Sequence, residues 1–202
     1  MEKREIPKST LERLPMYLHY LNTLKGIQNT ISSKYIANSL KLGEVQVRKD
    51  LALVSGDGRP KIGYDLKLLI LKIEEILKVN EKTKAVVVGT GKLGQALMEY
   101  EGFKEYGISI EAGFDIKTDI VQKKGKPIYE IRSLESYCKE NNIEIGIITV
   151  PENSAQEICD KLIESGVKGI WNFAPTNLNV SNNIKIKNEN MAGSLAILSS
   201  LL

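Results

Sequence analysis

The sequence has few cysteines and no long hydrophobic run. Its two cysteines, Cys138 and Cys159, have no partners at metal-ligand spacing, so we expect reduced, partly buried thiols and no metal site. No apolar run approaches the roughly 20 residues that span a bilayer, and no apolar block follows the charged N-terminal segment MEKREIPKS. A membrane-spanning protein and an exported protein are therefore not indicated, and we expect a cytoplasmic location.

Charge of one sign is not abundant either, because the net charge is only +3. The two halves differ, however. Residues 1–80 carry 14 Lys and Arg against 9 Asp and Glu, whereas residues 81–202 carry 14 against 16. This division favours binding of a polyanion by the first half and of a small ligand by the second.

The feature with the clearest chemical meaning is the segment KAVVVGTGKLG, residues 84–94. Its β-branched run is typical of a strand buried on both faces, and the spacing G-x-G-x-x-G follows it. Gly89 permits a sharp turn, Gly91 leaves room for a pyrophosphate, and Gly94 allows a helix to pack on the strand. We predict a phosphate site formed by Gly89, Gly91, Lys92, Leu93 and Gly94. The alternative is a glycine-rich turn that binds nothing.

The next predicted strand, residues 108–114, ends in Asp115. An acidic residue about 20 to 30 positions after the first glycine is placed to accept hydrogen bonds from both ribose hydroxyls, which favours NAD over NADP. Lys117 weakens this preference, since a nearby cation could bind a 2′-phosphate. Asp115 could alternatively be a solvated turn residue.

Beyond this strand, strand and helix patterns alternate. We predict strands at 127–129, 145–150, 167–172 and 184–187, and helices at 133–139 and 153–165. Repeated βα units indicate a parallel, Rossmann-like sheet. Ligands bind at the carboxyl ends of such strands, so we expect contributions from Thr149, Val150, Pro151, Asn172 and Phe173. Phe173 could lie against a nicotinamide or could be a core aromatic.

The first half has the patterns of short helices. Ser9 and Glu12 have the spacing of a capping box, and Pro15 requires the first regular helix to start close to it or to bend. Helices at 33–40 and 44–54 follow, joined by a turn at 41–43. Two short helices with such a turn match a helix-turn-helix, whose second helix enters the major groove.

The second of these helices supplies the recognition candidates. We expect Val45, Leu51 and Val54 on its inner face and Asp50 mostly outside. The candidates for contacts with bases or phosphates are Gln46, Arg48 and Lys49. Each could instead belong to an ordinary solvated helix face.

The glycine-rich segment 55–64 suits a hairpin wing, with Arg59 and Lys61 able to reach phosphates or a minor groove; a plain surface loop is the alternative. Asp65 is expected to cap a helix that ends near residue 80, and some apolar positions of that helix could face a partner subunit. We therefore divide the chain into a winged-helix DNA-binding domain (1–80), a Rossmann-like dinucleotide-binding domain (81–188) and a terminal dimerisation helix (189–202).

The terminal helix, MAGSLAILSSLL, carries no charge. Burying each of its large apolar side chains is worth roughly 1.5 to 3 kcal/mol, so the helix must be covered. It could pack on its own sheet or insert into a second subunit and make a dimer. We favour the second arrangement. The fold class is thus α/β, with an α-rich winged helix, a parallel sheet and an apolar last helix.

This combination resembles the Rex family of redox-sensing transcriptional repressors over essentially the whole chain. The most specific motifs are QVRKDL (46–51), GTGKLG (89–94), YEGF (100–103), FD (114–115), TVP (149–151) and GIWNFAP (169–175). The resemblance implies a homodimer that binds palindromic operator DNA and releases it when NADH, rather than NAD+, binds. It also implies that the last helix is exchanged between subunits, that Arg48 and Lys49 contact DNA, and that Tyr100 acts in the ligand-linked switch.

The chain departs from the family pattern at three places. His19 stands where the family usually has an arginine, and Asn190 stands where it usually has an aspartate, so the ion pair between these positions is absent or reduced to a hydrogen bond. The wing arginine is also displaced, because Arg59 and Lys61 flank Pro60. His19 could add pH sensitivity or could be an ordinary interface histidine.

An enzyme is the main alternative to a repressor. A dehydrogenase needs a general acid or base beside the nicotinamide, yet the only histidine lies in the basic half. The residues after Pro175 are also too few for a substrate domain. An oxidoreductase could still use Tyr100, Lys92 or a cysteine, and CoA or another nucleotide could occupy the same fold. The sequence favours a non-enzymatic NADH/NAD+ sensor.

Overall fold

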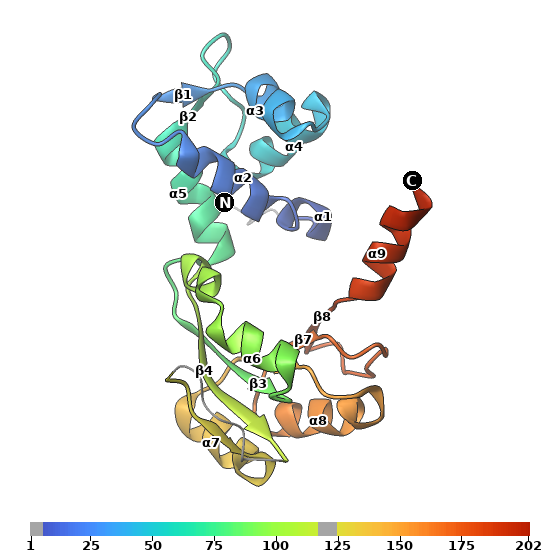
Figure 1. Cartoon of the computed structure of the whole chain (residues 1–202). Coiled ribbons are helices and arrows are strands. Elements are labelled where there is room, and N and C mark those ends of the chain that lie inside the picture. Colours follow the sequence, from blue (N-terminus) through green and yellow to red (C-terminus); the bar gives the residue numbers. More distant parts are fainter. Residues whose placement is uncertain (1–5, 117–124) are drawn as a thin grey trace. The chain divides into compact units, whose positions relative to one another are not determined.

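The computed structural model describes residues 6–116 and 125–202. The chain divides into two compact units, Met1–Glu81 and Lys82–Leu202 (Figure 1). Within the described residues no helix is long and apolar enough to cross a membrane. The same ranges contain no group of His, Cys, Asp and Glu side chains that could hold a metal ion.

The first unit is mainly helical. Its described elements are α1 (Lys8–Leu11), α2 (Leu14–Thr23), β1 (Thr30–Ile31), α3 (Ser33–Leu40), α4 (Glu44–Ser55), β2 (Tyr64–Asp65) and α5 (Leu66–Leu77). The predicted capping box is wrong, because α1 begins after Pro7 without a side-chain cap. The expectation for Pro15 is confirmed: it lies in the first turn of α2, where a missing N–H costs no helical hydrogen bond.

The pair α3 and α4 has the predicted helix–turn–helix form. Ser32 caps α3 by accepting a hydrogen bond from Tyr35 N, and the turn to α4 begins with Lys41 in the left-handed conformation at φ 55°. The inner face of α4 was predicted only in part. Leu51 and Val54 are buried as expected, but Val45 is 55% exposed and Val47 takes its place in the core.

The segment between α4 and α5 forms the predicted hairpin. Arg59 and Gly63 exchange two backbone hydrogen bonds of 2.8 Å, and β2 then pairs antiparallel with β1. We call residues 56–63 the wing. Asp65 caps α5, since its Oδ1 accepts a hydrogen bond from Leu68 N at 2.8 Å.

The second unit is built on a parallel sheet with the strand order β5-β4-β3-β6-β7-β8. The strands are β3 (Thr83–Val88), β4 (Ile108–Asp115), β5 (Ile128–Glu130), β6 (Ile145–Ile148), β7 (Gly169–Asn172) and β8 (Lys185–Asn188). The first strand of the sheet in sequence is β3; β4 and β5 are added in turn on one side of it, and the chain then crosses to β6 on the other side. The carboxyl ends of β3 and β6 therefore flank the point where the strand order reverses, which is where open α/β sheets bind ligands.

Both faces of this sheet are covered, as a run of β-branched residues requires. Val86 and Val88 pack on one face with the buried side chains of α7 (Leu134–Asn141) and α8 (Glu152–Glu164). Ala85 and Val87 pack on the other face with Met98 of α6 (Lys92–Glu99). Figure 1 shows α6 on the side of the sheet opposite α7 and α8. This alternation is that of a strand with period two.

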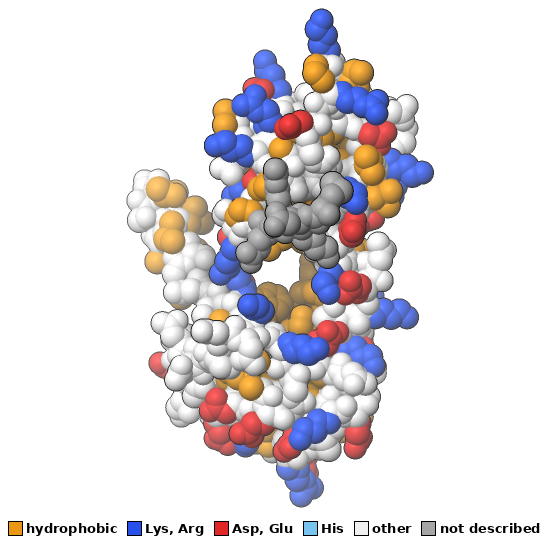
Figure 2. Space-filling view, turned by 180° about the vertical axis from the view of Figure 1, so that it is seen from behind, with side chains coloured by type: hydrophobic (Ala, Val, Ile, Leu, Met, Phe, Trp, Pro, Cys, Tyr) orange, Lys and Arg blue, Asp and Glu red, His pale blue; other side chains and the backbone are white. Residues whose placement is uncertain are grey.

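The last helix, α9 (Met191–Ser200), contrasts with the rest of the second unit because none of its residues is buried. Its large apolar side chains are 56–67% exposed at Met191, Leu195, Ile197 and Leu198. Figure 2 shows hydrophobic side chains on the surface of this helix, at the left of the view. Within the described residues of the second unit, α9 therefore has no covering surface.

Candidate dinucleotide and nucleic-acid sites

The three glycines of the loop after β3 have different surroundings. A Cβ added at Gly94 would lie 2.0 Å from the carbonyl oxygen of Gly89, so α6 could not pack so closely with any other residue there. Gly89 has φ +92°, which only glycine adopts readily, and an added Cβ would meet the backbone of Thr149 at 2.9 Å. Nothing lies within 4 Å of a Cβ added at Gly91. The loop is thus closed on its inner side and open at Gly91.

This open position coincides with the beginning of a helix. Gly91 is the N-cap residue of α6, so the first-turn N–H groups, which include those of Lys92 and Leu93, have no acceptor within the helix. Helix N-termini favour anions for this reason and because of the helix dipole. The residues present therefore fit a pyrophosphate.

Asp115, at the end of β4, lies directly beside the glycine loop. Its Oδ2 accepts hydrogen bonds from the backbone N–H of Thr90 at 2.6 Å and from the Thr90 hydroxyl at 3.0 Å. Two segments 25 residues apart in sequence are joined in this way. In dinucleotide-binding folds an acidic residue at this strand end can accept hydrogen bonds from the ribose hydroxyls. Lys117, the other predicted residue of this region, lies outside the described residues.

The loop after β6 completes the same edge of the sheet. Thr149 Oγ1 donates to the carbonyl oxygen of Gly89 at 2.5 Å, and Thr149 N donates to Val88 O at 2.9 Å. Val150 packs against the inner side of Gly89, and Pro151 is the N-cap residue of α8. The structure therefore brings the TVP segment and the glycine loop together.

Asn172 and Phe173, at the end of β7, differ in what they offer a ligand. The Asn172 side chain is fully buried: its Nδ2 donates to Thr176 O and Asn188 Oδ1, both at 2.9 Å, and its Oδ1 accepts from Ala174 N at 3.0 Å. The Asn172 side chain therefore holds the backbone of residues 174–176 in place and offers a ligand no free group. Phe173 is half-buried at the surface of the sheet, with its ring centroid 4.6 Å from that of Trp171.

The predicted switch residues occupy three different elements. His19 is exposed on α2 in the first unit. Tyr100, which follows α6, is 59% exposed, and its ring lies over Gly102. Asn190 is the N-cap of α9, where its Oδ1 accepts a hydrogen bond from Gly193 N at 2.7 Å. The Asn190 side chain thus has a capping partner within its own helix.

The nucleic-acid candidates lie on the surface of the first unit. Gln46, Arg48 and Lys49 are all exposed on the first two turns of α4. Figure 2 shows basic side chains over the visible face of this unit. In helix–turn–helix proteins, exposed polar and basic side chains at the start of the second helix contact phosphates and bases.

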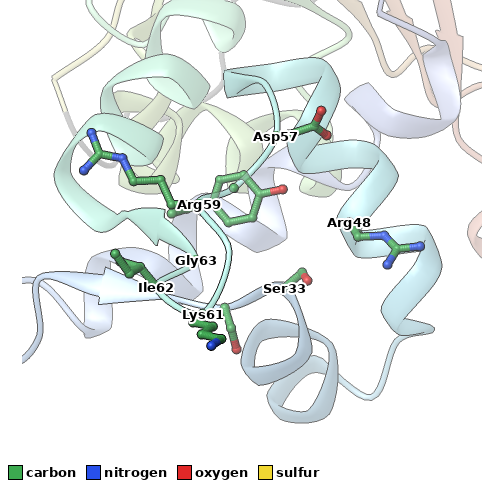
Figure 3. Close-up of a pocket in the computed structure, with 10 residues that line it drawn as sticks. Ser33, Arg48, Asp57, Arg59, Lys61, Ile62 and Gly63 are labelled. Carbon is green, nitrogen blue, oxygen red and sulfur yellow. The ribbon is translucent and has the colours of Figure 1, made fainter.

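The wing adds two further cations beside α4. A hollow of about 310 Å³ between α4 and the wing is lined by Arg48, Arg59 and Lys61. In Figure 3 Arg48 and Arg59 extend to opposite sides, so the cations frame the hollow rather than fill it. The Tyr64 ring packs closely against Gly58 of the wing: a Cβ added at Gly58 would lie 2.9 Å from that ring.

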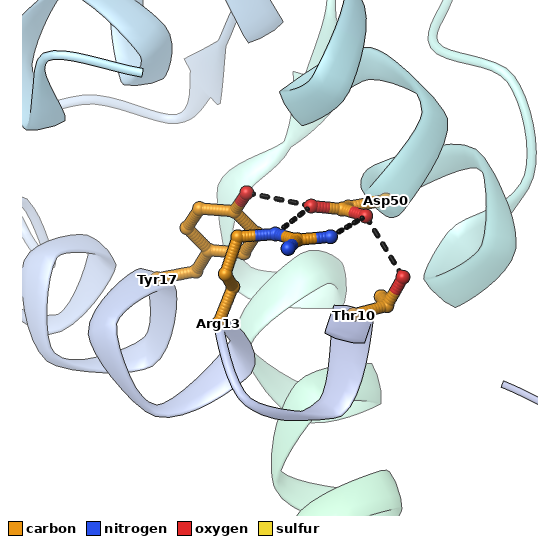
Figure 4. A network of polar contacts seen from close by, with 4 residues as sticks. All are labelled: Thr10, Arg13, Tyr17 and Asp50. Atoms are coloured by element: carbon orange, nitrogen blue, oxygen red, sulfur yellow. Dashed lines mark hydrogen bonds and ion pairs between the residues drawn. The ribbon is translucent and has the colours of Figure 1, made fainter. Parts of the chain in front are cut away.

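A buried polar network behind α4 was missed by the sequence reasoning. Asp50, predicted to lie outside, is 2% exposed and accepts a bidentate pair of hydrogen bonds from Arg13 at 2.7 and 2.9 Å. Tyr17 OH and Thr10 Oγ1 donate to the same carboxylate at 2.8 and 2.9 Å (Figure 4). The network fixes α4 against α1 and α2.

Electrostatics in this network follow from its hydrogen bonds. Burial by itself would raise the pKa of Asp50, but the hydrogen bonds from Arg13, Tyr17 and Thr10 outweigh it and hold that pKa below its ordinary value. Burial and the Asp50 carboxylate raise the pKa of the Tyr17 hydroxyl. The hydrogen bond with Asp50 raises the pKa of the Arg13 guanidinium.

Comparison with known proteins gives a separate match for each half of the chain. A family model described as a putative DNA-binding protein N-terminus matches residues 5–52, and one described as a CoA binding domain matches residues 80–176. The redox-sensing transcriptional repressor Rex of Carboxydothermus hydrogenoformans is 42% identical over 205 residues, covering 98% of this chain and 97% of that protein. Rex of Treponema denticola is 38% identical over 206 residues, covering 100% and 98%.

Solved structures give the same result. The Rex-family repressor RSP in complex with β-NAD+ and operator DNA superposes with a TM-score of 0.90 and 29% identity, covering 98% of this chain and 92% of that one. RSP in complex with β-NADH gives a TM-score of 0.85, with 97% and 93% covered. The fold, the glycine loop and the relatives together define a class, the redox-sensing transcriptional repressors. Within that class, the chain belongs to the Rex family.

Proposed function

We propose that this protein binds operator DNA as a homodimer and releases it when NADH binds. The observation that carries the proposal is the presence in one chain of a helix, α4, that exposes Arg48 and Lys49, and of a glycine loop that meets Asp115. RSP, which shares the fold along its length, was solved with operator DNA and β-NAD+ and also with β-NADH. Both states of the proposed switch, one with operator DNA and NAD+ and one with NADH, have thus been solved for a relative.

In the first unit we assign DNA contacts to Gln46, Arg48 and Lys49 on α4 and to Arg59 and Lys61 on the wing. Their exposure and the hollow between α4 and the wing support this assignment. Arg48 and Lys49 would release counterions from phosphates, so operator affinity should fall with salt. A homodimer presents two such helices, which suits a palindromic operator.

In the second unit we assign the pyrophosphate to the loop from Gly89 to Gly94 and the ribose to Asp115. The TVP segment and Phe173 would border the nicotinamide, while Asn172 would hold the Phe173 loop in place. The oxidised nicotinamide ring carries a positive charge that the reduced ring lacks, so one site can distinguish the two forms electrostatically. Asp115 favours NAD(H) over NADP(H).

We assign the covering of α9 to a second subunit, with an exchange of the helix between the two chains. Four large apolar side chains that are more than half exposed support this assignment. Each is worth roughly 1.5 to 3 kcal/mol when buried. A dimer also provides two dinucleotide sites. Shifting operator DNA from mostly bound to mostly free requires about 5 kcal/mol, of which each site would supply about half.

We assign the dinucleotide site to sensing rather than to turnover. His19, the only histidine, belongs to the first unit, and burial raises the pKa of both cysteine thiols to about 11, which disfavours the nucleophilic thiolate. His19, Tyr100 and Asn190 remain our candidates for the coupling. A repressor acts where the DNA is, so we place the protein in the cytoplasm.

Two variants test the two halves separately in a gel-shift assay on a palindromic operator. Arg48→Ala should weaken operator binding and flatten its salt dependence, because one cation facing phosphate or base is lost. Asp115→Asn should weaken NADH binding and leave operator binding in place. Unchanged operator affinity of the first variant, or unchanged NADH affinity of the second, would contradict the respective assignment.

A further inference from the structure

Four aromatic rings form a continuous row along one face of the second unit. We call Tyr100, Phe103, Trp171 and Phe173 the aromatic row. Ring centroids are 5.0 Å apart for Tyr100 and Phe103, 5.7 Å for Phe103 and Trp171, and 4.6 Å for Trp171 and Phe173. The first two contacts are edge-to-face, a favourable aromatic geometry. The row leads from the end of α6 to the carboxyl end of β7.

One carboxylate holds the centre of this row. Trp171 Nε1 donates a hydrogen bond of 3.0 Å to Glu189 Oε1. Glu189 is half-buried, and its backbone N–H donates to Asn172 O at 2.8 Å, so both its side chain and its backbone are fixed to the end of β7. Trp171 has a single donor and no acceptor, and the carboxylate gives it a charge-assisted partner.

Glu189 also has a defined place relative to the last helix. It directly precedes Asn190, the N-cap of α9, and a negative charge near a helix N-terminus is favourable. The same residue therefore contacts the aromatic row through its side chain and is joined through the backbone to the N-cap of α9. A change in the orientation of Trp171 must either move Glu189 or break the bond between them.

We propose that Glu189 is a positioning residue for the ligand switch, which fixes Trp171 and joins the aromatic row to the start of α9. This inference rests on the proposed function, because Phe173 borders the dinucleotide only if that site binds one. Ring positions that are set before the ligand arrives lower the cost of ordering them on binding. Loss of the bond would therefore weaken NADH binding although Glu189 does not touch the ligand.

The test uses Trp171, the only tryptophan of the chain, as a fluorescence reporter. Glu189→Ala should shift the emission maximum and weaken NADH binding about tenfold, equivalent to about 1.4 kcal/mol, in calorimetric titrations of the full-length protein. Glu189→Gln should restore both, since its amide oxygen can accept the same hydrogen bond. Glu157→Ala, which removes an exposed carboxylate paired with Lys161 on α8, is the matched control and should change neither.

A double-mutant cycle separates positioning from general stability. In a Trp171→Phe background, Glu189→Ala should cause no further loss of NADH affinity, because the bond is already absent. Equal emission and NADH affinity in wild type and Glu189→Ala would overturn the inference, as would a Gln variant as impaired as the Ala variant. Fully additive effects in the cycle would do the same. A wild-type protein that fails to bind NADH would instead refute the proposed function.

Discussion

Replacing Asp50 with Asn should destabilise the first unit more than any surface substitution. The side chain is 2% exposed and accepts four hydrogen bonds, two of them from the Arg13 guanidinium. Asn keeps the shape, but its NH2 group would face donors where the second carboxylate oxygen now accepts them. Arg13 would then lose its counter-charge at a site where its side chain is only 22% exposed.

The expected cost follows from this geometry. Removing one partner of a buried ion pair costs about 3 to 5 kcal/mol, and partial exposure of Arg13 places the value near the lower limit, about 3 kcal/mol. The cost should depend on pH. The folded-state pKa of Asp50 lies below its ordinary value, so its contribution is fully present above about pH 4 and is lost as the pH falls through the folded pKa.

Urea unfolding followed by far-UV circular dichroism at pH 7 and at decreasing pH measures this difference. Trp171 fluorescence reports on the second unit, to which Trp171 belongs. Asp57→Asn, on the exposed wing, is the matched control and should change stability by at most about 0.5 kcal/mol. An Asp50→Asn protein as stable as wild type at pH 7, or a difference that grows at low pH, would refute the reasoning.

Three further predictions concern glycines and thiols. Gly91→Ala should fold normally but bind NADH more weakly in calorimetric titrations, because its Cβ enters only the open side of the loop. Gly94→Ala places a Cβ 2.0 Å from a backbone oxygen and should lower the stability measured by urea unfolding. Equal stability of the two variants would contradict this geometry. Gly63→Ala, at φ +88° and 2.3 Å from a backbone oxygen of β1, should displace the wing and weaken operator binding in a gel shift, and normal binding would show that the wing is dispensable. Cys138 and Cys159, whose pKa is raised to about 11 by burial, should react with a thiol reagent at pH 8 much more slowly than in urea; equal rates would contradict their burial.

Most of the second unit could be predicted because its signals are local. A β-branched run that breaks into spaced glycines needs only nearby residues to define a strand, a turn and a helix, and the structure has all three. The join between Asp115 and the loop also follows from parallel strand order, since adjacent strands end at the same edge. Here the local pattern and the tertiary fold agree.

The burial of Asp50 in the first unit arises from contacts distant in sequence. A charged residue on a helix normally faces solvent, and only Arg13, Tyr17 and Thr10, at least 33 positions away, explain why Asp50 is buried. Asp50 shares the inner face of α4 with Val47, three residues before it, whereas Val45 lies outside that face. The helical period indicates the same face, because Val47 lies four residues before Leu51 and seven before Val54.

The aromatic row could not be predicted either, because its members come from separate elements. Phe103 lies in the short 3₁₀ helix Glu101–Tyr106, and Trp171 lies on β7. The residue that holds Trp171 follows β8, at the opposite end of the sheet order from β4 and β5. Sequence spacing does not predict these contacts, because they form only when the strands of the sheet are assembled.

The most direct measurement is operator affinity of the purified protein at constant salt with NADH, NAD+, NADPH or NADP+ added in turn. We expect NADH to raise the dissociation constant for the operator strongly, NAD+ to leave binding intact, and the two phosphorylated cofactors to act only at much higher concentration. An operator affinity that no nicotinamide nucleotide changes, or that NADH and NAD+ change equally, would contradict the account.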